Sequence, residues 1–509
     1  IGIGLNAGYY ATGSYNTFVG SEAGKGGQTS APYSKGQYNT AVGYKALNEF
    51  TTLGGAVAVG WEAARRATSA YGPLAVGNRA MHFLTTGGYN TAVGQESMLY
   101  NTTGERNTVV GYHAGSRFLQ YYSTAVGFHA GGYSTGSHNT FIGNEAGLGA
   151  SNSAPYSSGE KNTAVGSEAL KGFSSGYHNV AVGYQSLTSI STGHNNVAVG
   201  YGALDSLTTA DFTTAVGRGA GSNVTNGRFN TFYGYNAGGN SNASHVVAIG
   251  YNVYGSGASN KSYGVYIGSN AGRYDTSGEA TIAIGYNAVA CDSGGGNNPS
   301  SCIGIGNSAL NGITGQARSN IGIGGSALSN VTNGEYNTAM GQSVGSTLTT
   351  GDNNVLIGYN ADVSAAAGTN QIVVGQGATG VGDNTAIIGN SSVTDVYMGD
   401  NGSTWSTTSD GRLKENVEDW NVGLDAINNL RIVSYNFKKD NPYKYNSEKK
   451  RQGIIAQEAQ KVLPEMIKDD GEWLSANQEP MIWALVNSVK ELSKKVEEQQ
   501  KEIEELKKK

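Results

Sequence analysis

A serine and a lysine lie five positions apart in the C-terminal fifth of the chain, at Ser409 and Lys414. The Asp-Gly pair between them, residues 410–411, favours a tight turn that brings the lysine amine back towards the serine hydroxyl. A hydroxyl beside an amine is the minimum equipment for a serine nucleophile with a lysine general base. An ordinary polar turn is the alternative interpretation, and the sequence on either side has to decide between the two.

The residue composition changes at this pair, which indicates two parts of different architecture. Residues 409–509 hold 37 of the 71 charged residues but only four of the 78 glycines. Only 38% of the chain is hydrophobic, and so many glycines argue against a large conventional core in the first part. We therefore predict a repetitive shaft over residues 1–399 and a linker over residues 400–408.

The overall charge and the apolar runs bear on possible partners. The net charge is -5 and no extended basic patch is present, so we expect no nucleic-acid partner. No apolar run approaches the roughly 20 residues needed to cross a bilayer, so we expect no membrane insertion. The chain begins in mid-pattern at Ile1, and we expect an attachment region before it.

A short phrase, Asn-Thr-Ala-Val-Gly or a near variant, returns along the shaft at a fixed step, as from Gly43 to Gly60 to Gly77. A longer period repeats residues 31–34 as residues 154–157. Self-similarity at a fixed step is the signature of a solenoid, in which each unit buries itself only by stacking on the next. The closing glycines of the phrase include Gly43, Gly60, Gly77, Gly94, Gly111, Gly166, Gly183, Gly200, Gly217 and Gly234.

The residues of the phrase predict the local structure of each coil. The β-branched residue before the glycine, such as Val42 or Ile249, indicates a strand of four or five residues with one buried face, and the asparagine suits a turn. The predicted fold is mainly β: a parallel β-solenoid or β-roll with coils of about 17 residues and a core formed by one line of Val and Ile. At about 4.8 Å per coil, some two dozen coils give a rod on the order of 110 Å long.

The phrase resembles the Asn-Ser-Val-Ala-Ile-Gly repeat of the left-handed β-roll in the heads of trimeric bacterial adhesins, and residues 246–250 are its nearest copy. The adhesin repeat is shorter, so the handedness and the shape of the coil stay open.

Tyrosine is abundant, with 31 copies, and many copies follow the repeat glycine directly. Exposed rows of tyrosine offer a rigid surface that can stack on sugars or grip a protein partner. Alternatively, these rings cover the edge of the solenoid or pack between chains. The candidate binding residues are Tyr44, Tyr112, Tyr184, Tyr201 and Tyr235.

Histidine and cysteine give no spacing typical of a metal site, so we expect neither a metal nor another cofactor. His138, His178 and His194 precede the repeat asparagine and would have to meet their copies from other chains to bind an ion. Cys291 and Cys302 are interpreted as two free thiols, with a local disulfide as the alternative.

The C-terminal part has the patterns of an α+β domain that ends in a coiled coil. Residues 421–430 have helical spacing, residues 432–437 alternate like a strand, and residues 453–463 read as a strand followed by a helix that Pro464 stops. Apolar residues then follow a heptad pattern, which predicts a coiled coil over residues 481–509. Gln499 interrupts the pattern, either to set the register or as a tolerated break. The heptad residues are Ile482, Leu485, Val489, Leu492, Val496, Ile503 and Leu506.

Four segments in order, residues 409–416, 453–458, 463–467 and 490–492, resemble the intramolecular chaperone of endosialidase-type phage tailspikes and tail fibres, the peptidase S74 domain. The resemblance implies a trimeric chaperone over residues 409–480 that cuts itself off between Thr408 and Ser409. It assigns Ser409 as nucleophile and Lys414 as base. Lys414 must then be neutral, and we expect assembly to remove it from water.

This resemblance leads to a functional hypothesis for the whole chain. We expect a homotrimeric tail fibre in the virion tail, made in the host cytoplasm, that binds a glycan or protein receptor on the host cell and joins other tail proteins. The alternative is a tailspike that degrades a surface polysaccharide, which needs paired acids about 5 to 9 Å apart. Only 19 acids precede Ser409, and the sequence indicates no such pair.

Overall fold

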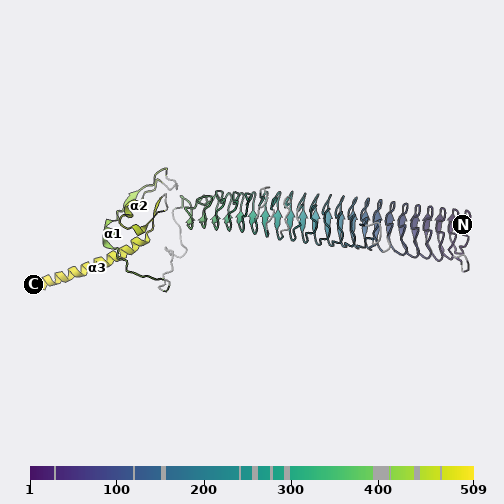
Figure 1. Ribbon diagram of the computed structural model, residues 1–509, viewed down its shortest axis with the longest axis horizontal. Helices are drawn as coiled ribbons and strands as arrows, with labels where there is room; N and C mark the ends of the chain where they lie inside the picture. The colour runs from purple at the N-terminus through teal and green to yellow at the C-terminus, as the bar shows by residue number, and fades with distance from the viewer. Residues whose placement is uncertain are drawn as a thin grey trace. The chain divides into compact units, whose positions relative to one another are not determined.

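The chain divides into two compact units, Ile1–Ile388 and Gly389–Lys509, which are described separately (Figure 1). The computed structural model describes residues 1–27, 30–31, 33–117, 121–150, 156–239, 242–254, 262–275, 279–291, 299–393, 412, 414–440, 447–469 and 473–508.

The described residues of the first unit form a 23-stranded sheet in which each strand pairs in parallel with the next strand of the chain, from β1 to β23. Val180 pairs with Val197, and Val197 with Thr214, so the observed step between coils equals the predicted one and confirms the solenoid. Some coils are longer, such as those in which Phe18 pairs with Ala41 and Phe141 with Ala164. The strands are β1 (Gly2–Ile3), β2 (Thr17–Val19), β3 (Thr40–Val42), β4 (Val57–Val59), β5 (Leu74–Val76), β6 (Thr91–Val93), β7 (Thr108–Val110), β8 (Thr124–Val126), β9 (Thr140–Ile142), β10 (Thr163–Val165), β11 (Val180–Val182), β12 (Val197–Val199), β13 (Thr214–Val216), β14 (Thr231–Tyr233), β15 (Val247–Ile249), β16 (Val265–Ile267), β17 (Ile282–Ile284), β18 (Ile303–Ile305), β19 (Ile321–Ile323), β20 (Thr338–Met340), β21 (Val355–Ile357), β22 (Ile372–Val374) and β23 (Ala386–Ile388).

The predicted core of Val and Ile is wrong, because the strands turn these residues outward. From β2 onward each strand has three residues, and from β2 to β22 only the middle one is fully buried. In β3, Ala41 is 0% exposed whereas Val42 is 37% exposed. Side chains alternate between the two faces of a strand, so the first and third residues share the outer face. The line of Val and Ile is therefore a surface feature.

In many coils the interior is filled from a second position, six residues after the middle of the strand. Leu47 and Leu170 occupy this position and are fully buried. Both have a left-handed backbone, with φ of 54°. This conformation turns the chain sharply after the strand.

The asparagines, which the sequence placed at turns, connect successive coils through their side chains. Asn179 is fully buried, and its Oδ1 accepts the backbone N–H of Asn196 at 3.0 Å. Its Nδ2 donates to the carbonyl of Gly193 at 2.8 Å, and its own N–H donates to Asn162 Oδ1 at 2.9 Å. Where asparagine precedes successive strands, such a ladder satisfies buried backbone groups at the turn.

The two cysteines are free and buried, which confirms the free-thiol interpretation and excludes the local disulfide. Cys302 precedes β18, where most coils have the ladder asparagine, and its thiol donates to the carbonyl of Ala317 at 3.2 Å. Burial raises the pKa of the Cys302 thiol to about 12.

The second unit has a small core around Leu463, Met466 and Ala484. The long C-terminal helix confirms the predicted helical tail, and the shorter elements begin or end within a few residues of the predicted ones. The elements are α1 (Leu424–Asn429), β24 (Val433–Tyr435), β25 (Arg451–Gly453), α2 (Ala456–Ala459), the 3-10 helix η2 (Pro464–Met466), β26 (Ile467–Asp469), β27 (Leu474–Ala476) and α3 (Glu479–Lys508). β24 pairs with β25 and β26 with β27, both antiparallel.

Candidate functional site

The predicted nucleophile and the bond it would attack, Thr408 and Ser409, lie outside the described residues. Lys414 is described and exposed in the single chain. The predicted pairing of Ser409 with Lys414 therefore stays a prediction, and one chain alone does not provide the burial expected for Lys414.

The backbone that follows Lys414 is held by the C-terminal helix. Nδ2 of Asn487 in α3 donates to the carbonyl oxygens of Trp420 at 2.7 Å and Val422 at 3.1 Å. Oε2 of Glu491, one turn further, accepts the backbone N–H of Leu424 at 3.3 Å. Sequence analysis missed this link, because nothing in the spacing of Asn487 or Glu491 indicates which distant segment they contact.

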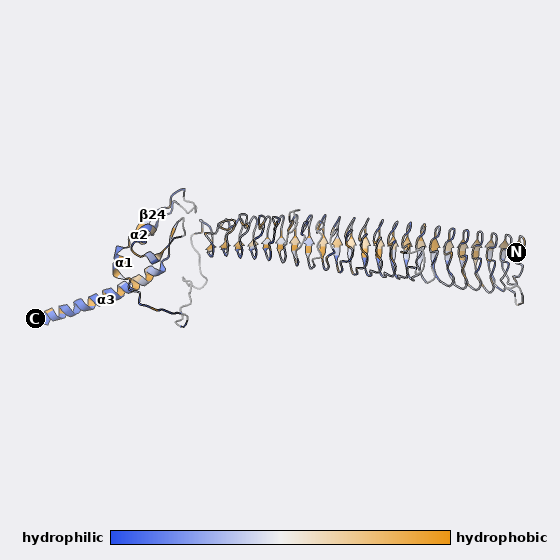
Figure 2. Cartoon of the chain, in the orientation of Figure 1, coloured by the Kyte–Doolittle hydropathy of each residue, from blue (hydrophilic) through white to orange (hydrophobic). Residues whose placement is uncertain are grey.

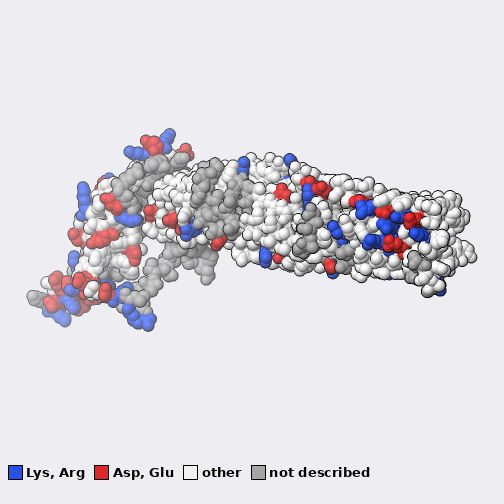
Figure 3. Space-filling view, turned by 45° about the vertical axis from the view of Figure 1, so that its right-hand side comes forward, with Lys and Arg blue, Asp and Glu red and all other residues white. Residues whose placement is uncertain are grey.

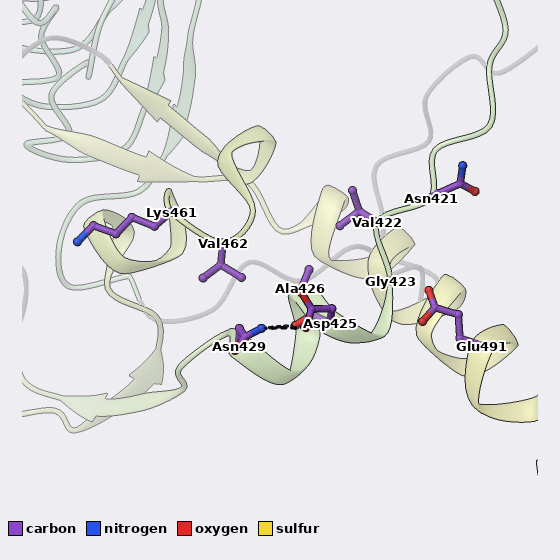
Figure 4. A pocket seen from close by; sticks show the side chains of 9 residues that line it. All are labelled: Asn421, Val422, Gly423, Asp425, Ala426, Asn429, Lys461, Val462 and Glu491. Carbon is purple, nitrogen blue, oxygen red and sulfur yellow. Dashed lines mark hydrogen bonds between the residues drawn. The ribbon is translucent and has the colours of Figure 1, made fainter. Parts of the chain in front are cut away.

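These contacts border an open, mainly polar depression of about 680 Å³. Figure 4 shows Glu491 directed at the bend around Gly423, and Asp425 joined to Asn429 within α1. Lys461 and Val462 line the depression from the turn after α2. The charged residues of its lining are Asp425, Lys461 and Glu491.

The helix α3 carries two distinct rows of side chains. One row faces its own domain: Ala484 and Ser488 are buried, and Asn487 and Glu491 make the contacts above. The predicted heptad row is exposed along its described length. Its members are exposed as follows: Ile482 51%, Leu485 43%, Val489 62%, Leu492 47%, Val496 61%, Ile503 44% and Leu506 69%.

The strands of the solenoid are rich in apolar residues, which Figure 2 shows in orange. Their first and third residues form an uncharged stripe on the outer face of the sheet. No first or third position of strands β2 to β23 holds Asp, Glu, Lys or Arg. Parallel sheets are normally covered on both faces, and such strands are apolar on both sides. We call the third positions the outward row: Val19, Val42, Val59, Val76, Val93, Val110, Val126, Ile142, Val165, Val182, Val199, Val216, Tyr233, Ile249, Ile267, Ile284, Ile305, Ile323, Met340, Ile357, Val374 and Ile388.

The five candidate tyrosines are exposed and stack on the equivalent residues of neighbouring coils. Tyr184 stacks on Tyr201 with ring centroids 5.4 Å apart, and Tyr235 stacks on Tyr251 at 5.2 Å. The guanidinium of Arg218 lies between the two pairs, 5.3 Å from the ring of Tyr201 and 5.5 Å from that of Tyr235. Tyr44 stacks on Trp61 and Tyr112 stacks on Phe128.

A second aromatic column precedes the strands, at the position of the three histidines considered above. Phe212, Phe229, His245 and Tyr263 stack in sequence with centroids 5.2, 5.0 and 4.9 Å apart. His138 and His194 likewise stack on tyrosine rings. Among the residues that the structure describes, no group of three or more His, Cys, Asp or Glu is placed to bind a metal.

Charged side chains of both signs are mixed on the solenoid surface, and Figure 3 shows one such cluster. Arg65 pairs with Glu62 at 3.1 Å and Arg79 pairs with Glu96 at 3.1 Å, while His113 Nε2 lies 2.6 Å from Glu96. Mixed pairs of this kind give no extended basic surface. Within the described chain, no helix combines the length and apolar character needed to span a bilayer.

Residues 409–468 match the protein family described as Peptidase_S74, chaperone of endosialidase. The chain therefore carries a Peptidase_S74 domain in its second unit, as the sequence motifs predicted, and a match to this family implies a self-cleaving chaperone peptidase. A parallel β-solenoid followed by this domain is consistent with a tail fibre or tailspike that has an intramolecular chaperone. The matched region ends before α3 begins at Glu479.

Proposed function

We propose that the chain is a structural, receptor-binding fibre of a phage tail whose C-terminal domain drives assembly and then removes itself. The match of residues 409–468 to the endosialidase chaperone family carries this proposal. The solenoid explains the need for a chaperone. Its coils are nearly identical, so strands can pair out of step by one coil at little cost, and slow non-local pairing exposes unpaired edges.

The proposed cleavage uses Ser409 as nucleophile and Lys414 as base. Ser409 Oγ attacks the carbonyl carbon of Thr408 while Lys414 takes the hydroxyl proton. The peptide bond to the Ser409 nitrogen breaks as that nitrogen receives a proton, which leaves the Thr408 acyl group as an ester on Oγ. Water then hydrolyses the ester, giving a carboxyl group on Thr408 and restoring the serine hydroxyl.

A denaturing gel tests the cleavage. The parent chain is expected to give two fragments that separate between Thr408 and Ser409, and Ser409→Ala or Lys414→Ala is expected to give one full-length band. N-terminal sequencing of the shorter fragment should begin at Ser409. A parent chain that stays whole after assembly contradicts the self-removal.

The proposed assembly is a homotrimer, supported by two exposed apolar surfaces of a single chain. The heptad row of α3 suits a coiled coil, and the outward row of the solenoid lacks charge from β2 to β23. Sedimentation equilibrium on the full chain tests the count, since a trimer has three times the mass of one chain. A mass equal to one or two chains overturns the trimer.

In this proposal the fibre resides in the virion tail, is made in the host cytoplasm, and contacts a host-surface glycan or protein through the aromatic columns. The exposure of Tyr184, Tyr201 and Tyr235 supports the contact. Incubation with host surface polysaccharide tests it against the alternative of a depolymerase. Retention without shortening fits a fibre, and shorter products indicate a polysaccharide-degrading tailspike.

A further inference from the structure

Two side chains of α3 hold the backbone between the predicted catalytic lysine and helix α1. Asn487 holds the carbonyls of Trp420 and Val422, and Glu491 holds the amide of Leu424. These contacts join parts of the chain that are far apart in the sequence. One described helix therefore fixes every second residue of a short segment that starts only six residues after Lys414.

Glycine at position 423 permits this close approach. A Cβ on Gly423 would lie 2.0 Å from Glu491 Oε1 and 3.3 Å from Asn487 Cβ. Lack of space against α3 therefore favours glycine at this position.

The α3 side chains that hold residues 420–424 form one row, and the heptad row, which is available to partner helices, is separate from it. Asn487 and Glu491 lie on the side of Ala484 and Ser488, which are 0% and 4% exposed. Val489 and Leu492 of the heptad row are 62% and 47% exposed. With 3.6 residues per turn, the two rows are roughly a third of a turn apart, so α3 can bind other helices and the segment together.

We infer that Asn487 and Glu491 are positioning residues for self-cleavage: α3 fixes residues 420–424, and association of α3 with its copies thereby sets where the segment bearing Lys414 lies. This inference rests on the proposed function. Asn487 and Glu491 contact residues 420–424, and the scissile bond itself lies outside the described residues. They act through the backbone of Trp420, Val422 and Leu424, and they make cleavage depend on an assembled α3.

The experiment uses the full chain with Asn487→Ala, Glu491→Gln and Gly423→Ala, compared with Asn487→Gln and Glu498→Gln. Asn487→Ala removes the amide that donates to Trp420 and Val422, and Glu491→Gln weakens the contact with Leu424. Gly423→Ala displaces Glu491 without removing any contacting group. Asn487→Gln keeps the amide donor. Glu498 is the matched control, because it lies seven residues after Glu491 on the same side of α3 and is exposed.

Three measurements separate positioning from folding. Sedimentation should give the parental mass for all variants. In a Ser409→Ala background, which keeps every chain uncut, amide exchange at Leu424 should be faster by about tenfold in the three disrupting variants. The rate of self-cleavage should fall about ten- to a hundredfold in those variants, since small misplacements of reacting groups have effects of that size. Asn487→Gln should recover part of the rate, and Glu498→Gln should match the parent.

The outcomes distinguish this inference from the proposed function. A parent chain that is never cut overturns self-cleavage itself. A parent that is cut, with disrupting variants that assemble, exchange faster at Leu424 and still cut at the parental rate, overturns only the positioning role. Parental exchange at Leu424 in Gly423→Ala and Asn487→Ala would show that the contacts do not hold the segment, and this also overturns the inference. If one variant loses assembly, the others decide the matter.

Discussion

The ring of Phe141 fills the space that a side chain on Gly147 would occupy, because a Cβ there would lie 2.2 Å from Phe141 Cδ1. The next coil uses the opposite arrangement, with small Ala164 at the middle of the strand and Leu170 six residues later. Phe18 with Gly24 and Phe232 with Gly238 repeat the first arrangement. In each of these coils, one large side chain lies either at the middle of the strand or six residues later.

Because the large side chain can occupy either position, we predict that two substitutions that each destabilise the coil compensate for each other when combined. Phe141→Ala should leave a cavity that costs about 3–5 kcal/mol, and Gly147→Leu should clash with the ring. The double variant should be more stable than either single variant, because it recreates the pair seen at Ala164 and Leu170. Thermal unfolding followed by circular dichroism measures this. A double variant no better than the worse single one would contradict this compensation.

The asparagine ladder should contribute to stability at single positions. Asn179→Ala removes the partner of the Asn196 amide and of the Gly193 carbonyl, both buried, and each orphaned group costs about 1–3 kcal/mol. Asn144→Ala, at an exposed position, is the control and should change stability by less than about 0.5 kcal/mol. If both substitutions change the unfolding midpoint equally, the ladder asparagine contributes no more to stability than an exposed asparagine.

The buried thiol of Cys302 should resist alkylation in the folded chain. Its pKa of about 12 keeps the thiol neutral near pH 8, and only the thiolate reacts. Iodoacetamide should modify both cysteines readily in denaturant and hardly at all without it, as mass spectrometry can show. The folded pKa lies above the ordinary value of 9.0, so the thiol's contribution to stability is complete below about pH 9 and is lost as the pH rises towards 12. Rapid labelling at pH 8 without denaturant would contradict its burial.

The outward row should tolerate charge poorly if the solenoids associate through it. Val182→Lys with Val199→Lys places two ammonium groups where burial costs several kcal/mol per unpaired ion. The unfolding temperature of the assembled chain should fall, and dilution should lower the sedimenting mass more than in the parent. Thr192→Lys with Thr209→Lys, at exposed turn positions, is the control and should match the parent. Parental behaviour of the Val182 and Val199 variant would exclude this face as an interface.

The regular step between repeats was enough to predict the solenoid, because only stacking can bury strands so short. The step did not predict which face of each strand is buried. A phrase such as Thr-Ala-Val is apolar on both faces, so hydropathy alone did not reveal that Ala41 points inward and Val42 outward. The left-handed backbone at Leu47 was also hidden, since glycine rather than leucine usually indicates that conformation.

The sequence predicted which domain holds the candidate site, but it did not predict the contacts within that domain. The motif around Ser409 and Lys414 indicated the domain that the family comparison found. The contacts of Asn487 and Glu491 join segments that are distant in the sequence, and no local pattern encodes such a pairing.

The glycine that closes each repeat has a consequence for how such a chain can lengthen. A Cβ on Gly43 would lie 2.4 Å from the carbonyl oxygen of Gly60, and the same close contact recurs between Gly60 and Gly77. Successive coils thus meet through nearly identical flat surfaces, and one coil fits on another. Genetic duplication can add whole coils without disturbing the rest, as the return of residues 31–34 at 154–157 suggests. The length of the solenoid is therefore a trait that can change by whole coils, whereas a few extra residues have to bulge from a turn.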